Sequence, residues 1–235
     1  MKKLSFLSLL LIAFTGCQIE ELETPVQETI PENEMATYYV GIDSDIETRT
    51  SLSNEGKILW SEGDKMNVFF GINNNEKDAL VLMGGAGTEN GSFYGPYIAT
   101  PDDVESLHQT VIVYPYDENM TCTPNEDKTE YSIAMTVPSV QQYAKGSFGN
   151  GAYPMVGVTK NTKEVVISTK NLLSGMNVKI KGDVSISKIV LTSADLALAG
   201  PATVVAAYGK APVVTVEEST ALNTVELVCD GVQLN

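Results

Sequence analysis

The sequence predicts an all-β protein of the β-sandwich class, from three observations. From Thr37 onward, segments rich in Val, Ile, Tyr and Thr are separated by Gly, Pro, Asn and Asp clusters about every ten residues, as in sandwich strands joined by turns. Helical periodicity is almost absent, and only residues 101–109 are expected to form a short helix. With 235 residues and 43% apolar content, the chain is long enough to bury a sizeable core.

Three segments predict individual strands. Residues 131–137 (YSIAMTV) and 176–181 (MNVKIK) alternate apolar and polar side chains, which predicts strands with one buried and one solvated face. Residues 111–114 (VIVY) are apolar on both faces, as in a central strand covered on each side. This strand is expected to end at Pro115, which cannot donate a ladder hydrogen bond.

Residues 58–70 predict a strand, a tight turn and a second strand. The turn falls on residues 61–64 (SEGD), where Gly63 is free to adopt positive φ. Trp60 is the lone tryptophan and is expected to anchor the core. A change of composition near residue 160 predicts a domain boundary, with one domain over 37–160 and a second over 161–235.

The N-terminus resembles a bacterial lipoprotein signal peptide over residues 1–16. Lys2 and Lys3 precede an apolar stretch over residues 4–14, which is too short to span a bilayer. Thr15 and Gly16 are small residues directly before Cys17, which is therefore the expected lipidation site. Several acyl chains on one residue give stable anchoring. The alternative is a plain secretory signal that is cleaved elsewhere.

Residues 17–36 predict an acidic tether. Residues 18–36 contain six Glu, two Pro and no basic residue, a composition that favours an extended, solvated chain. An acidic stretch directly after a lipidated cysteine resembles the surface-export signal of Bacteroidetes lipoproteins, although a simple polar spacer would have the same composition. The expected location is the cell outer membrane, lipid-anchored and surface-exposed.

The charge balance excludes one class of partner. Fifteen Lys and Arg stand against thirty Asp and Glu, so the formal net charge is −15. Because nucleic-acid binding needs clustered Lys and Arg that contact phosphates, nucleic acid is not an expected partner.

No constellation of residues predicts catalysis, a metal site or a cofactor. His108 is the only histidine and is expected at the surface, and residues 83–87 (MGGAG) read as a hairpin loop because they lack phosphate-loop spacing. Cys122 and Cys229 lack metal-ligand spacing, so two separate thiols are expected, with a disulfide as the alternative. A hydrolase that uses two carboxylates stays open on composition alone.

Two further groups of residues have more than one interpretation. Residues 102–103, 117–119 and 125–127 carry Asp, Glu and Asn that suit solvated turns better than a calcium loop. Several aromatic side chains either close the sandwich core or, where exposed, stack on sugar rings. They are Tyr38, Tyr39, Phe93, Tyr94, Tyr97, Tyr114 and Tyr116.

An ordered series of landmarks along most of the mature chain resembles the Bacteroidetes fimbrillin-like family, whose members are lipoprotein precursors of pilus subunits. The landmarks are residues 48–50 (TRT), 60–66 (WSEGDKM), 114–116 (YPY), 137–142 (VPSVQQ), 151–155 (GAYPM), 171–180, 186–191 and 198–200 (LAG). The resemblance implies two transthyretin-like β-sandwich domains, lipid-mediated export and assembly through strands supplied by neighbouring subunits.

The same resemblance singles out Arg49. In the family an Arg-specific protease cuts after the first strand of the precursor, and Arg49 is the only arginine here. The alternative is that residues 48–50 form a strand-entry motif that is not cut. Family members continue for further strands, so the second domain is expected to be truncated in this sequence or incomplete.

The expected function is that of a non-enzymatic, lipid-anchored fimbrillin-like surface protein, a pilus subunit or adhesin that assembles through strands. Its expected partners are other pilus subunits or a surface ligand. The alternative is a surface lipoprotein that binds glycans and captures polysaccharide.

Overall fold

The computed structural model describes residues 34–43, 58–70, 77–97, 109–145, 148–149, 151–160, 164–176 and 178–234. These residues form fourteen strands joined by turns and loops and contain no helix, so the all-β prediction is confirmed for this part of the chain. All of them fall within the contact unit that spans residues 31–235. The helix expected over 101–109 falls outside the description, apart from Gln109.

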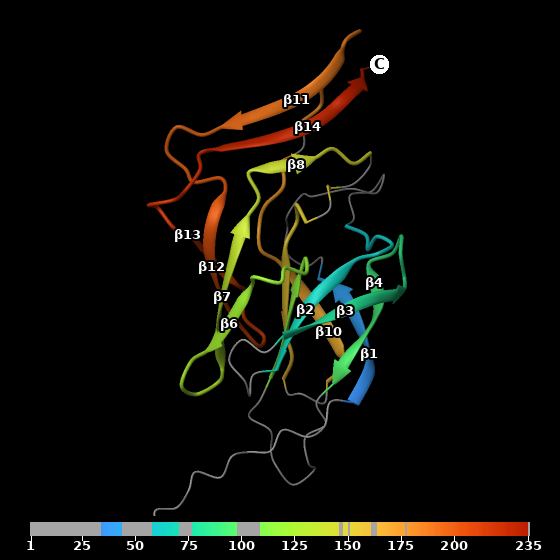
Figure 1. The fold of residues 1–235 in the computed structure, drawn as a ribbon, viewed down its shortest axis with the longest axis vertical. Coiled ribbons are helices and arrows are strands. Elements are labelled where there is room, and N and C mark those ends of the chain that lie inside the picture. The colour runs from blue at the N-terminus through green and yellow to red at the C-terminus, as the bar shows by residue number, and fades with distance from the viewer. Residues whose placement is uncertain are drawn as a thin grey trace, which may run out of the picture. The chain divides into compact units, whose positions relative to one another are not determined.

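Seven strands close into a barrel in the order β1, β10, β9, β5, β2, β3, β4 (Figure 1). All neighbours in this ring are antiparallel except β1 and β10, which run parallel. The strands are β1 (Glu34–Ile42), β2 (Lys65–Phe70), β3 (Lys77–Gly84), β4 (Asn90–Tyr97), β5 (Thr110–Tyr114), β9 (Met155–Val158) and β10 (Val166–Asn171). Closure pairs both edges of each of these strands.

The interior of the barrel is filled by apolar side chains from all seven strands and from Trp60, just before β2. Trp60 is 2% exposed, as predicted for a core anchor. Its ring makes edge contacts with Phe93 and Tyr114, at centroid distances of 5.0 and 5.6 Å. The indole Nε1 donates a hydrogen bond to Val40 O at 3.2 Å. Trp60 therefore ties together β1, β4 and β5.

The turn between Trp60 and β2 is held by Asp64, which is buried. Asp64 Oδ2 accepts from Ser61 N at 2.7 Å, and Asp64 Oδ1 accepts from the Tyr114 hydroxyl at 3.0 Å. Gly63 has φ +85, as the turn prediction required. The strand expected over 58–60 is wrong, because this segment contacts the loop before β4 mainly through the backbone N and O of Trp60.

A four-stranded sheet in the order β13, β12, β7, β6 packs against the outside of the barrel, and a second apolar cluster fills the interface. On the barrel side, Phe69, Val111, Val113 and Val156 face this sheet, whereas Ile112 points into the barrel. The prediction that residues 111–114 are covered on both faces is confirmed, and β5 ends before Pro115 as expected. The sheet strands are β6 (Thr121–Pro124), β7 (Glu130–Val137), β12 (Gly200–Ala207) and β13 (Val213–Val216).

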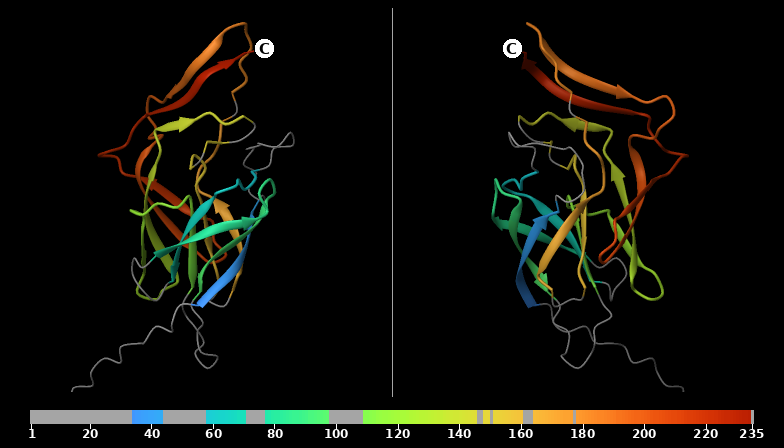
Figure 2. Two further views of the ribbon diagram at one scale, coloured as in Figure 1. Left: turned by 45° about the vertical axis from the view of Figure 1, so that its right-hand side comes forward. Right: turned by 180° about the vertical axis from the view of Figure 1, so that it is seen from behind.

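A three-stranded sheet, here called the C-terminal sheet, has the order β11, β14, β8. Its strands are β8 (Val140–Gln142), β11 (Ser185–Thr192) and β14 (Thr224–Gln233). The chain passes from β7 directly into β8 through Pro138 and Ser139, so one extended segment contributes to two sheets (Figure 2). Pro138 suits this change of sheet because proline cannot donate to a ladder.

The two alternating segments had different outcomes. Residues 131–137 form most of β7, with Tyr131, Ile133, Met135 and Val137 buried, so that prediction is confirmed. The strand expected over 176–181 is wrong in the described residues. Met176, Val178 and Ile180 there are 66, 54 and 41% exposed, because no described strand pairs with this segment and no apolar surface covers it.

Strand pairing crosses the domain boundary expected near residue 160. β10 follows that position in sequence but pairs with β9 and β1, and β12 pairs with β7 over eight residues. The division into residues 37–160 and 161–235 therefore does not coincide with a division between sheets.

Replacement of Trp60 is expected to destabilise the barrel. Trp60→Ala removes the largest interior side chain and its edge contacts, and should lower the free energy of unfolding by about 3–5 kcal/mol. Urea denaturation followed by circular dichroism measures this loss, with Tyr143→Ala as the control because Tyr143 is 44% exposed. A loss below about 1 kcal/mol would contradict the role assigned to Trp60.

Candidate functional site

β1 occupies a slot in the barrel between β4 and β10. It pairs antiparallel with β4 over eight residues and parallel with β10 over four. Tyr38 and Val40 point from β1 into the interior, where they are 0 and 1% exposed. The Tyr38 hydroxyl donates to Pro96 O at 2.8 Å, and burial raises the pKa of Tyr38 above its usual range. The slot thus offers two strand edges and an apolar floor, the features that strand addition uses.

Both sequence-predicted modification sites lie outside the described residues. Cys17 lies before β1, and Arg49 lies in the segment that joins β1 to β2. In sequence, Arg49 separates the strand that fills the slot from all the other strands of the described residues. In the part of the chain that the structure describes, no helix has the length and apolar character needed to cross a bilayer.

The C-terminal sheet presents an open edge at β11, because no other described strand pairs there. Ser193 donates its N–H to Asn223 O at 2.9 Å, just beyond the end of β11. Bonded and non-bonded pairs alternate along antiparallel strands, so the N–H and C=O of Val190 and Thr192 point away from β14. The backbone of β11 is therefore available to a further strand.

Exposed apolar side chains lie on one face of this sheet, at β11 and at β8. Val190 and Val140 are 48 and 56% exposed and lie in one row across the sheet, on either side of Glu226. Lys188 Nζ pairs with Glu226 Oε2 at 3.0 Å on the same face. On the opposite face Val225 contacts a small buried cluster. In the sequence, residues 186–191 are only a landmark of the family resemblance. The alternation of apolar and polar residues does not show which strand lies at the edge of a sheet.

The aromatic residues singled out in the sequence divide into core and surface. Tyr38 and Phe93 are fully buried, and Tyr114 packs partly buried against the barrel interior, which raises its pKa through burial and the nearby Asp64. By contrast, Tyr39 and Tyr94 are 56 and 44% exposed on the outside of the barrel. The register places Tyr39 opposite Ser92, so Tyr94 is its diagonal neighbour on β4.

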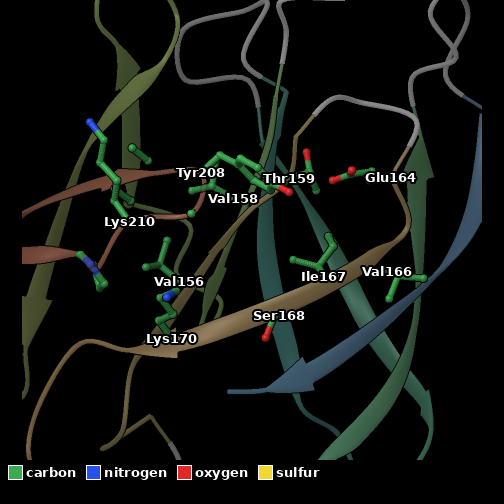
Figure 3. A pocket seen from close by; sticks show the side chains of 14 residues that line it. Val156, Val158, Thr159, Glu164, Val166, Ile167, Ser168, Lys170, Tyr208 and Lys210 are labelled. Atoms are coloured by element: carbon green, nitrogen blue, oxygen red, sulfur yellow. The ribbon is translucent and has the colours of Figure 1, made fainter. Parts of the chain in front are cut away.

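A pocket of about 350 Å³ lies between β10 and the turn that joins β12 to β13. Figure 3 shows Val158 and Tyr208 in the upper part of the view and Ser168 and Lys170 along β10. The Tyr208 side chain is 49% exposed. Sequence reasoning missed Tyr208, although its position before Gly209, between two Val-rich runs, is typical of a hairpin turn.

The two thiols are buried and are not joined to each other, and Cys122 lies in the apolar cluster between the barrel and the four-stranded sheet. Burial raises the pKa of Cys122 to about 12, so its thiol stays protonated and a weak nucleophile at neutral pH. Cys229 is also buried, at 6% exposed. His108, the only histidine, lies outside the described residues.

Two of the acidic segments, residues 117–119 and 125–127, form turns, and residues 102–103 lie outside the described residues. Asp117 Oδ1 accepts from Asn119 N at 2.8 Å, and Asn125 Oδ1 accepts from Thr129 N at 2.9 Å. Within the described ranges, no group of three or more His, Cys, Asp or Glu side chains could hold a metal ion. Residues 85–89 form the loop between β3 and β4, so the glycine-rich stretch leads into a hairpin loop, as predicted.

Comparison with known proteins identifies no relative. No family model, no curated protein and no solved structure matches this chain.

Stability is expected to fall at alkaline pH. Burial raises the pKa of Cys122 from 9.0 to about 12 and that of Tyr131 from 10.0 to about 12. The unfolded chain therefore releases these protons at lower pH than the folded chain, so the free energy of unfolding declines as pH rises from 9 toward 12. Urea midpoints measured at pH 8, 10 and 11 should decrease in that order.

The control for this prediction is Cys122→Ala. The decline between pH 8 and 10 should be smaller in this variant, because tyrosines ionise at higher pH. Equal midpoints at pH 8 and 11 in the unaltered chain would contradict the prediction.

Proposed function

We propose that this chain is a lipid-anchored cell-surface protein of the fimbrillin-like family, a pilus subunit or adhesin that assembles by exchange of strands. One observation carries the proposal. The first strand, β1, fills a slot between two other strands, and the only arginine of the chain lies directly between β1 and the rest of the fold. The protein acts by binding rather than by catalysis.

The structural basis of assembly is the replacement of β1. Cleavage after Arg49 leaves β1 held only by its hydrogen bonds to β4 and β10 and by side chains such as Tyr38 and Val40. A strand from a neighbouring subunit that carries apolar residues at alternate positions can make the same backbone bonds and fill the same interior. Exchange of one strand for another conserves the core, so each filled slot is stable.

The barrel strands and the four-stranded sheet that packs against them form, in this proposal, one β-sandwich domain. A transthyretin-like β-sandwich is supported by the face-to-face packing of β2, β5 and β9 against the sheet that contains β7 and β12. The open edge of the C-terminal sheet at β11 is a second place for strand addition in this proposal.

Anchoring and location complete the proposal. The signal peptide over residues 1–16 is removed, and Cys17 carries the lipid. The acidic tether was expected over residues 17–36, but residues 34–36 already belong to β1, so the tether ends before Glu34. It leads from the outer membrane to β1, and the folded part faces the cell exterior. Release of β1 by cleavage at Arg49 also separates the fold from its anchor.

Substitution of Arg49 tests the cleavage step. Arg49→Ala in the native cells should abolish subunits that begin at Thr50 and reduce filaments at least about tenfold, with the protein retained in the membrane fraction. Mass spectrometry and electron microscopy of sheared surface material measure both effects. Arg49→Lys is the matched variant. It keeps the positive charge and removes only the guanidinium group that an Arg-specific protease recognises. Filaments at normal levels in Arg49→Ala cells would refute the cleavage step.

Substitution at β11 tests the open edge. Val190→Pro removes an N–H that points away from β14, so assembly through this edge should be lost while pairing with β14 is kept. Val190→Lys is a second variant that places a charge at the edge. Val205→Lys is the control, because Val205 is 40% exposed on β12, which has a neighbour on each side. Filament yield from sheared cells measures the effect, and yields equal to the control would exclude the β11 edge.

A further inference from the structure

We propose that the outer face of β10, β1 and β4, together with the adjoining pocket, binds a neutral saccharide chain. This surface is here called the tyrosine face, after Tyr39 and Tyr94. It is distinct from the strand edges used in assembly, because its contacts are made by outward side chains rather than by backbone groups.

The tyrosine face combines exposed rings with hydroxyl groups. Outward side chains between the rings are Thr37 on β1 and Ser92 on β4, and Ser168 lies outward on β10. Each hydroxyl can both donate and accept a hydrogen bond. A pyranose ring has an apolar face of C–H groups and a rim of hydroxyls, so it matches an aromatic ring flanked by hydroxyls.

The face is continuous with the pocket beside β10. Tyr39 is the register partner of Val166, which is 74% exposed and lines that pocket. Tyr208 and Glu164 also line it, and they add a third exposed ring and a carboxylate that can accept from sugar hydroxyls (Figure 3). A volume of about 350 Å³ falls within the range of small-ligand pockets. A chain molecule can therefore enter the pocket and continue across β1 to Tyr94.

Charge selects a neutral ligand. Among the outward side chains at 35–41, 90–96 and 166–170, only Lys170 is charged, and its Nζ lies 3.8 Å from Asp43 Oδ2. The adjoining pocket adds one charge of each sign, Glu164 and Lys210, so the whole surface has little net charge. A chain with net charge −15 repels polyanions.

The test uses the full mature chain, with mass spectrometry confirming that it is intact through Arg49, because Tyr39 belongs to β1. Electrophoresis in gels that contain starch, mannan, xylan or β-glucan measures retardation, and polygalacturonate is the anionic comparison. At least one neutral polysaccharide should retard the protein, and polygalacturonate should not. Failure of all four, or retardation by polygalacturonate alone, would overturn the proposal.

Variants place the binding on the tyrosine face. Tyr39→Ala and Tyr94→Ala should each weaken binding roughly threefold to tenfold, and Tyr39→Phe should retain most of it. Tyr143→Ala is the matched control, because Tyr143 is also 44% exposed but follows β8 in a different sheet. Circular dichroism confirms that each variant is folded. Equal retardation of all variants would overturn the proposal, as would sedimentation showing a dimer that Tyr39→Ala dissociates.

The gel test does not depend on strand-mediated assembly, because it uses the chain that is intact through Arg49 and still carries Tyr39 on β1. Both proposals are supported if a neutral polysaccharide retards the intact protein in the gel and Arg49→Ala cells lose their filaments as expected. Loss of filaments without any retardation overturns the saccharide site alone, and retardation without filaments overturns assembly alone.

Discussion

The barrel depends on Trp60, whose indole lies at the point where three strands meet. Its edge contacts reach Phe93 on β4 and Tyr114 on β5, and its Nε1 bonds to the backbone of β1. Gly91 on β4 could not be a larger residue, because a Cβ at that position would lie 2.9 Å from the Trp60 ring. The buried Asp64 then sets the turn into β2 and holds the Tyr114 hydroxyl. Through these contacts Trp60 joins β1, β4 and β5, and Asp64 joins the turn before β2 to Tyr114 on β5.

This arrangement makes β1 both essential and replaceable. Its side chains complete the interior around Trp60, yet β1 is the first strand of the described residues, and residues 43–64 separate it in sequence from β2. A strand with alternate apolar residues in the same slot satisfies the same contacts. No tight turn ties β1 to either neighbour, because β4 and β10 both lie far from it in sequence.

The surface is divided between edges and faces. β11 ends a sheet and offers backbone groups, whereas Tyr39 and Tyr94 offer rings on a face whose edges are already paired. The strong acidity of the chain does not extend to the outward side chains of β10, β1 and β4. A surface with exposed apolar side chains and little charge, on a chain of net charge −15, is typical of a binding site.

The sequence by itself determined the local features, because alternation, turn residues and the two-sided apolar run depend on neighbours along the chain. It therefore predicted β7, β5, the Gly63 turn and the burial of Trp60. Only the tertiary structure decided which strands pair, because hydrogen bonds between distant segments leave no local pattern. For that reason the strand predicted over residues 176–181 was wrong, and the closure of the barrel was not predicted. Tyr38 and Tyr39 illustrate the limit: they are adjacent and identical in type, and only the placement of β1 sends one into the core and the other to the surface.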